Sequence, residues 1–197
     1  MRWSSVWCFL LFSTAPGWAY SHHAYRSSSD LDGPLFKVAG LTFTVPEKWQ
    51  SVPPESPARV GRWRIPPTPE NEGDAVQAVV FFFGPGAGGT TQQNLDAWVS
   101  EVSAPGGAKI VPEIKTRQAG PFKITQETLF GTFQQVVPAP GVPPLEKENY
   151  GLLGGVVESP QGTIYWRVTG PAPAITALEP LFAKILDSVK PASAAKP

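Results

Sequence analysis

Apolar and polar side chains alternate along several segments of the chain, and this alternation predicts β-strands. In the segment 41–45 every second residue is large and apolar, the pattern of a strand with one buried face. The segment 60–65 places its arginines on one face and Trp63 and Ile65 on the other. The segment 75–83 is almost continuously apolar, which predicts a central strand covered on both faces.

Two segments follow the helical period instead. From Thr90 to Ser103 apolar residues recur at helical spacing, and Thr90 with Gln93 fits a capping box. The apolar stripe of this helix consists of Leu95, Trp98, Val99 and Val102. A second helix is predicted over 175–189, with Thr176 at its start and Pro180 in or near its first turn.

Further strands are predicted in the second half of the chain. They are the segments 109–118, 122–137 with a bulge at Gly131, and 150–158 and 163–170, the last two joined by the hairpin turn SPQG. The Pro-rich segment 138–149 is expected to be a surface loop. This order of elements predicts an α+β fold, a single domain at 35–190 in which helices flank a largely antiparallel sheet.

The two ends of the chain have a different character. Arg2, the apolar run after it, and the small residues Gly17 and Ala19 fit a secretory signal peptide, 1–19, cleaved before Tyr20. The alternative is an uncleaved anchor or a core helix, although the run is shorter than the ~20 residues of a membrane span. We expect an exported protein, periplasmic or secreted, with no integral membrane span in the mature chain. A flexible leader is expected at 20–34 and a disordered tail at 191–197.

Charge and composition restrict the function. The 16 basic residues balance the 16 acidic ones, so no electrostatic footprint for nucleic acid is present. Signal cleavage removes Cys8, the single cysteine, and the two histidines, His22 and His23, fall in the expected leader. The folded region therefore lacks the Ser-His and Cys-His catalytic arrangements and the preferred ligands of zinc. We expect no cofactor and no metal site.

A glycine-rich loop follows the apolar strand. Gly84, Gly86 and Gly89 match the dinucleotide fingerprint G-x-G-x-x-G, but the parallel βαβ context is missing and Pro85 removes a backbone N–H. The loop is better explained as a tight strand-to-helix connection in which glycines allow positive φ. A loosely bound carboxylate or phosphate at the helix N-terminus stays open as an alternative.

Three segments resemble a family of uncharacterised exported bacterial proteins. FFFGPGAGGTTQQNLDAW is similar to that family's Gly-Pro-Gly loop and its helix with Asn94 and Trp98. LTFTVPEKW resembles its opening strand, which ends in Pro-x-x-Trp at Trp49. YWRVTGPAPAIT, followed by PLFAKILDSV, resembles its closing strand, its turn at Gly170 and Pro171, and its last helix.

The opening strand and the closing helix also resemble, more distantly, the PsbP-like fold. That fold is shared by extrinsic subunits of photosystem II and by a Ran-binding nuclear-import factor. The resemblance implies an antiparallel sheet flanked by helices and a role in binding or assembly, with no catalytic residue, although fold alone does not carry function.

Carboxylates are the remaining candidates for chemistry. Glu146 and Glu148 lie in the Pro-rich segment, whereas Glu127 and Glu158 lie on predicted strands, and their pairing does not follow from the sequence. Asp30 and Asp32 have no calcium-loop spacing around them.

Two further groups have a functional and a structural interpretation. The arginines around Trp63 form either an anion or partner patch or a solvated strand face. Trp49, Trp98 and Trp166 line either an apolar pocket or the plain core. The full set of candidate structural or contact residues is Trp49, Arg59, Arg62, Arg64, Gly84, Gly86, Gly89, Asn94, Trp98, Gly170 and Pro171.

These observations favour a monomeric, non-enzymatic protein that binds a protein partner in the cell envelope, with the Pro-rich loops near 51–57 and 138–144 as candidate contact surfaces. An exposed apolar patch with a polar rim would support this hypothesis. The alternatives are a binder of small ligands with a tryptophan-lined pocket, and a hydrolase that uses carboxylates alone.

Overall fold

The computed structural model describes residues 31–66, 68, 75–104, 108–135, 141 and 143–192. The expected signal peptide, most of the expected leader, parts of the Pro-rich segment and the last five residues lie outside the described residues.

A large antiparallel sheet forms the centre of the molecule. Its strand order is β3-β4-β5-β10-β9-β8-β6, and β7 pairs with the side of β8 that faces away from β9. The strands are β3 (Gln50–Ser51), β4 (Arg59–Ile65), β5 (Val76–Phe82), β6 (Val102–Ser103), β7 (Glu113–Ala119), β8 (Phe122–Gln135), β9 (Leu145–Ser159) and β10 (Gly162–Pro171). The expected α+β class is therefore confirmed.

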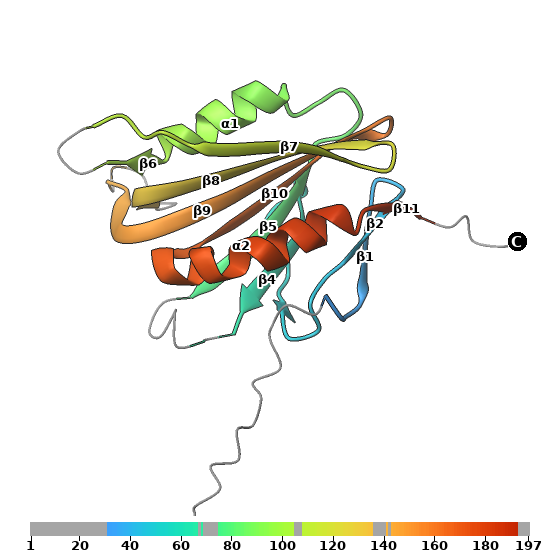
Figure 1. Cartoon of the computed structure of the whole chain (residues 1–197), viewed down its shortest axis with the longest axis horizontal. Coiled ribbons are helices and arrows are strands. Elements are labelled where there is room, and N and C mark those ends of the chain that lie inside the picture. The colour runs from blue at the N-terminus through green and yellow to red at the C-terminus, as the bar shows by residue number, and fades with distance from the viewer. Residues whose placement is uncertain are drawn as a thin grey trace, which may run out of the picture.

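A second, smaller sheet and two helices complete the described fold. The small sheet contains β1 (Leu35–Val38), β2 (Leu41–Thr44) and β11 (Lys190–Pro191), all antiparallel. The helices are α1 (Thr91–Ser100) and α2 (Ala172–Asp187). They lie on opposite sides of the large sheet, with the small sheet beside α2 (Figure 1).

The alternation of side chains gives the strands their two faces. In β4, Trp63 and Ile65 are buried and Arg64 is exposed, as predicted. In β5 the prediction of two covered faces is wrong on one side: Val76, Ala78 and Val80 are buried, but the residues between them are only partly buried. Partly exposed apolar residues, Val79 among them, made this strand look more buried than it is.

The first helix begins as the sequence predicts. Thr90 is the N-cap, its side chain accepts from the backbone N–H of Gln93, and the Gln93 side chain accepts from the N–H of Thr90. The helix ends at Ser100, so Val102 extends the apolar stripe from the short strand β6 rather than from the helix.

The second helix begins earlier than predicted. It starts at Ala172, directly after β10, and Pro180 lies inside it. Thr176 is not a cap, because its hydroxyl donates to the carbonyl oxygen of Ala172 one turn before it, at 2.9 Å. The expected turn at Gly170 and Pro171 is thus replaced by the last residues of a strand, with Pro171 as the N-cap of α2.

The outer limits of several segments also differ. Residues 145–149, expected in a loop, belong to β9. At the C-terminal end β11 pairs with β2, and the N–H of Ala192 donates to the Gly40 carbonyl at 2.7 Å. At the other end the carbonyl of Asp32 accepts from the N–H of Glu47 at 2.9 Å. The pairing that closes the small sheet therefore joins the two ends of the described chain.

The large sheet separates two hydrophobic clusters. The larger cluster fills the side of α2 and the small sheet, and the smaller cluster lies beneath α1. In the larger one, Trp63 and Trp166 stack with ring centroids 5.6 Å apart, and Phe43 meets Trp166 edge-on at 5.3 Å. These rings hold the small sheet against the large one.

Two adjacent glycines in the middle of β9 allow both helices to approach. A Cβ on Gly154 would lie 2.3 Å from the ring of Trp98, which comes from α1. A Cβ on Gly155 would lie 2.8 Å from Leu186, which comes from α2. Because neighbouring residues of a strand point to opposite faces, each glycine makes room for one helix.

Substitution of Gly154 tests this packing. We expect Gly154→Ala to lower the free energy of unfolding by about 2 kcal/mol, because the new methyl group overlaps the Trp98 ring in a filled core. Urea titration followed by circular dichroism measures the change. In a double-mutant cycle, Trp98→Leu should remove most of the penalty, since it removes the overlapping atoms. An equal penalty in both backgrounds would contradict the assignment.

Candidate binding surface on the central sheet

One face of β4 and β5 is left open by the helices. Helix α1 lies on the same side of the sheet but packs over β8 and β9, where Trp98 covers Gly154. In the register of β4 and β5, Arg59 pairs with Phe81 and Arg64 with Gln77, so their side chains share this open face. We call it the arginine–aromatic surface, defined as Arg59, Arg62, Arg64, Gln77, Phe81 and Phe83.

A single carboxylate bridges two of the arginines. Glu55 accepts from Nη1 of Arg59 at 2.5 Å through one oxygen and from Nη1 of Arg62 through the other. Nη2 of Arg62 also donates to Oε1 of Gln77 at 3.3 Å. Among the described residues the side chain of Arg64 makes no hydrogen bond or ion pair, and it is exposed. Within the described chain this surface therefore carries three guanidinium groups, of which Glu55 pairs with two.

A shallow pocket opens at this end of the surface. It has a volume of about 80 Å³ and is lined by Val52, Arg62, Trp63, Arg64 and Gln77. Pockets that enclose small-molecule ligands have volumes of roughly 300–1,000 Å³. The pocket thus has room for a few waters or a single carboxylate, but not for an enclosed ligand.

The other end of the surface is aromatic. The rings of Phe81 and Phe83 stack with centroids 6.2 Å apart, and Phe83 meets Tyr165 of β10 edge-on at 5.9 Å. Arg59 lies over Phe81, with its guanidinium carbon 5.8 Å from the ring centroid. Phe83 is 46% exposed. The result is an exposed apolar patch with a charged rim, which is typical of interaction sites.

A partly buried ion pair borders this surface. Arg167 of β10 donates to both carboxylate oxygens of Glu101 and lies 5.3 Å over the ring of Phe133. Burial lowers the pKa of Arg167, the charge of Glu101 opposes this, and the charge of Arg59 adds to the lowering. Arg59 and Arg167 are therefore close enough to repel, whereas Glu101 balances the charge of Arg167.

The glycine loop borders the aromatic end. Gly84, Gly86 and Gly89 have φ values of 99°, 70° and 79°, which a turn of this kind requires and which side chains other than glycine rarely adopt. The side-chain amide of Asn94 donates to the Gly88 carbonyl at 2.8 Å, and the Tyr165 hydroxyl donates to the Gly89 carbonyl at 3.0 Å. The loop is held as a connection between β5 and α1, and Asn94 has a structural role.

Side chains already bind part of the helix N-terminus beside this loop. The capping box satisfies the N–H groups of Thr90 and Gln93, and the Thr91 hydroxyl donates to Glu158 at 2.8 Å. An incoming phosphate would meet the negative charge of Glu158. Every strand pairing in the described residues is antiparallel, so the parallel βαβ unit of a dinucleotide fold is absent there.

The tryptophans do not line one pocket. Trp49 and Trp166 belong to the cluster on the α2 side, whereas Trp98 belongs to the cluster beneath α1. The interpretation of these three residues as the wall of a common cavity is wrong, because the sheet lies between them. At the end of β10, a Cβ on Gly170 would lie 2.7 Å from Val76, so this glycine serves close packing of two strands.

The carboxylates are separated as well. Glu158 is bound to Thr91 and to Lys123, with Nζ of Lys123 at 3.0 Å, and these hydrogen bonds outweigh burial and lower its pKa. Glu127 is fully buried and its two oxygens have no hydrogen-bond partner in the described chain. Burial, with a smaller contribution from the charge of Asp96, raises the pKa of Glu127 to about 7. A carboxyl enclosed in this way has no cleft through which to meet a substrate.

The sequence indicated the arginines of this surface but not its other members. Glu55 lies in a Pro-rich loop that was a candidate contact surface for its composition alone. Phe81 and Phe83 were counted as core because the apolar run hides their alternation with buried neighbours. Their separation by one residue within FFF was the available signal that they share a face.

Comparisons with known proteins find a similarity in structure but none in sequence. No protein-family model and no curated protein sequence matches this chain. The chain is similar to the solution structure of cyanobacterial PsbP from Synechocystis sp. PCC 6803, with a TM-score of 0.47 and 10% identity over 80% of this chain and 91% of that chain. A similarity of this size carries no argument, so membership of either resembled family stays a prediction. The antiparallel α+β architecture rests on the strand pairings themselves.

The described residues contain neither a membrane-spanning helix nor a cluster of metal ligands. Neither helix in that part of the chain is long and apolar enough to cross a membrane. The same residues contain no group of three or more His, Cys, Asp or Glu side chains placed to hold a metal ion.

The pH dependence of stability tests the burial of Glu127. The pKa of Glu127 is about 7 in the folded chain and near the ordinary 4.5 in the unfolded chain, so the folded state holds the proton of Glu127 more tightly. This proton therefore contributes fully to the stability of the fold below about pH 4.5, and the contribution is lost as the pH rises to about 7. Between pH 5 and pH 8, the free energy of unfolding of the wild type should fall by roughly 2 kcal/mol relative to Glu127→Gln. Urea unfolding at both pH values measures this difference.

Glu148→Gln is the matched control, because Glu148 is exposed on the neighbouring strand β9. It should behave like the wild type at both pH values. If Glu127→Gln shows the same pH dependence as the wild type, Glu127 does not titrate in the way that its burial implies.

Proposed function

We propose that this protein is exported and acts without catalysis, by binding a protein partner in the cell envelope through the arginine–aromatic surface. The observation that carries the proposal is the exposed Phe83 ring, stacked on Phe81 and rimmed by Arg59 on an open sheet face. Aromatic side chains and arginine are the residue types enriched at the energetic centres of protein interfaces.

The small-ligand alternative has less support. Ligand pockets are concave and enclose most of their ligand. The pocket at Arg62 and Arg64 has only about 80 Å³. A flat surface with a shallow pocket at one end suits a protein segment. One side chain of the segment can enter the pocket while its other side chains contact the flat part.

The enzymatic alternative also has less support. A glycosidase of the carboxylate type needs two acids facing one cleft, about 5 to 10 Å apart. Glu127 is enclosed beneath α1, and Glu158 is engaged by Lys123 and Thr91 at the N-terminal end of that helix. Neither faces the pocket at Arg62, so these two acids do not have the required setting.

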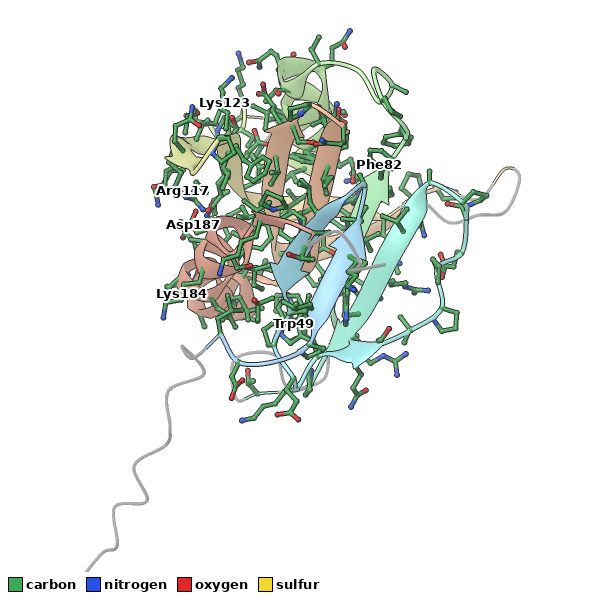
Figure 2. All side chains as sticks on the ribbon, turned by 90° about the vertical axis from the view of Figure 1, so that its right-hand side faces the viewer. Trp49, Phe82, Arg117, Lys123, Lys184 and Asp187 are labelled. Atoms are coloured by element: carbon green, nitrogen blue, oxygen red, sulfur yellow. The ribbon has the colours of Figure 1, made fainter. Side chains whose placement is uncertain are left out.

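Site-specific photocrosslinking in intact cells tests the proposal. We would introduce p-benzoylphenylalanine at position 83 and, separately, at position 64 of a tagged full-length chain. Position 184 is the control, because Lys184 is exposed on α2, away from the end of β5 marked by Phe82 (Figure 2). Adducts are purified from the envelope fraction and identified by mass spectrometry.

The expected result is one recurring protein adduct at positions 83 and 64 and a yield at least ~10-fold lower at position 184, since only the first two positions lie on the proposed interface. Equal yields at all three positions, or no adduct at 83 and 64, would contradict a partner at this surface.

A further inference from the structure

The side chain of Glu55 has the contacts of a bound ligand rather than of a structural residue. Its carboxylate bridges Arg59 and Arg62, yet it is 54% exposed. It lies in the loop between β3 and β4, whose hydrogen bonds are made by backbone groups: the N–H of Val52 donates to Arg62 and that of Arg59 to Ser56, at 3.0 and 3.1 Å. The loop is therefore fixed without Glu55.

An exposed ion pair of this kind is readily exchanged. Solvent screens the attraction, and holding long side chains in one geometry opposes it, so such pairs contribute little to stability. A carboxylate that arrives with an apolar neighbour excludes water from the same arginines, and the interaction is then stronger. Glu55 can thus be displaced by an acidic residue of a partner.

The surface offers a second carboxylate position next to the first. Arg64 has no partner among the described residues, and the pocket of about 80 Å³ lies between it and Arg62, with Gln77 at its wall. Two arginines and one glutamine thus line a space of the size of a carboxylate. Within the described residues, three arginines and one glutamate leave this surface with positive charge, which favours an acidic partner.

The distance between the arginine end and the aromatic end of the surface sets where the partner segment carries an apolar residue. From Gln77, opposite Arg64, to Phe83 the surface follows six residues of strand, or roughly 20 Å at about 3.3 Å per residue. A segment that contacts both ends in extended form therefore carries an aromatic residue about five or six positions from its acidic residues.

We propose that the arginine end of this surface is a carboxylate-binding subsite for an acidic, aromatic-containing segment of a partner protein, and that Glu55 occupies it as an internal competitor until that segment binds. This proposal rests on the proposed function, because it states the chemistry of the partner at the same surface. It assigns Arg62 and Arg64 as the residues that bind the acidic side chain of the partner segment.

Peptide binding to the purified mature protein tests the subsite without knowledge of the partner. The probe is a fluorescein-labelled twelve-residue peptide with two glutamates placed five and six residues after a tryptophan. The control peptide carries glutamine at both positions. Fluorescence anisotropy gives the dissociation constant for the wild type, Glu55→Gln, Arg62→Gln, Arg64→Gln and Lys184→Gln.

We expect the glutamate peptide to bind the wild type at least ~10-fold more tightly than the glutamine peptide, as for a charge pair at an interface. Glu55→Gln should tighten binding by about 3- to 10-fold by removing the competitor, a gain that a purely structural role of Glu55 would not give. Arg62→Gln and Arg64→Gln should each weaken binding about 10-fold. Lys184→Gln should leave it unchanged. Arg64→Gln removes no side-chain hydrogen bond or ion pair of the described chain, and circular dichroism of this variant checks that its fold is unchanged.

Three outcomes would overturn the subsite. The first is equal binding of the two peptides, or of the wild type and Arg64→Gln. The second is no tightening in Glu55→Gln, which would remove the competitor role. The third is binding of the wild type to phosphatidylglycerol vesicles through Arg62 and Arg64 with no binding of the peptide, which would assign the surface to lipid. Each leaves the photocrosslinking at position 83 unaffected, so a partner trapped there would still support the proposed function.

Discussion

Two adjacent glycines at the centre of β9 set how closely both helices pack against the large sheet. Gly154 leaves space for the Trp98 ring of α1 on one face, and Gly155 leaves space for Leu186 of α2 on the other. A side chain at either position would push one helix away from the sheet. The helices would then no longer cover the two hydrophobic clusters that the sheet separates.

This packing also explains which part of the sheet stays open. Helix α1 is only 10 residues long and is fixed over Gly154, so it covers β8 and β9 and does not extend over β4 and β5. The uncovered strands keep their alternation, with buried Val80 on one face and Phe81 on the other. The arginine–aromatic surface is thus a consequence of the position of α1 on the sheet. The glycine loop after Phe83 fixes this position through the hydrogen bonds of Asn94 and Tyr165.

The position of α1 also explains the burial of the Glu127 carboxyl group. Glu127 pairs in register with Gly154, so it points to the face that α1 covers. Burial without a hydrogen-bond partner favours its neutral form and raises its pKa to about 7. Among the described residues, the acid with the most perturbed pKa therefore lies in the packing beneath α1, whereas the open surface displays guanidinium groups and aromatic rings. These are side-chain types enriched at protein interfaces.

The sequence by itself determined the elements that depend on local rules. Alternation gave β2 and β4, the capping box at Thr90 gave the start of α1, and the turn SPQG gave the β9–β10 hairpin, because each depends on neighbours within a few residues. The sequence predicts the start of α2 too late, because it places Pro180 in or near the first turn. A proline is also tolerated inside a helix when tertiary packing supports the other residues of that helix. The tertiary structure alone decided which tryptophans share a core, that Glu127 lies beneath α1, and that Glu55 reaches Arg59 and Arg62. Those relations join residues on different strands, loops and faces, and they are set by strand order and helix seating, which no local pattern in a single chain encodes.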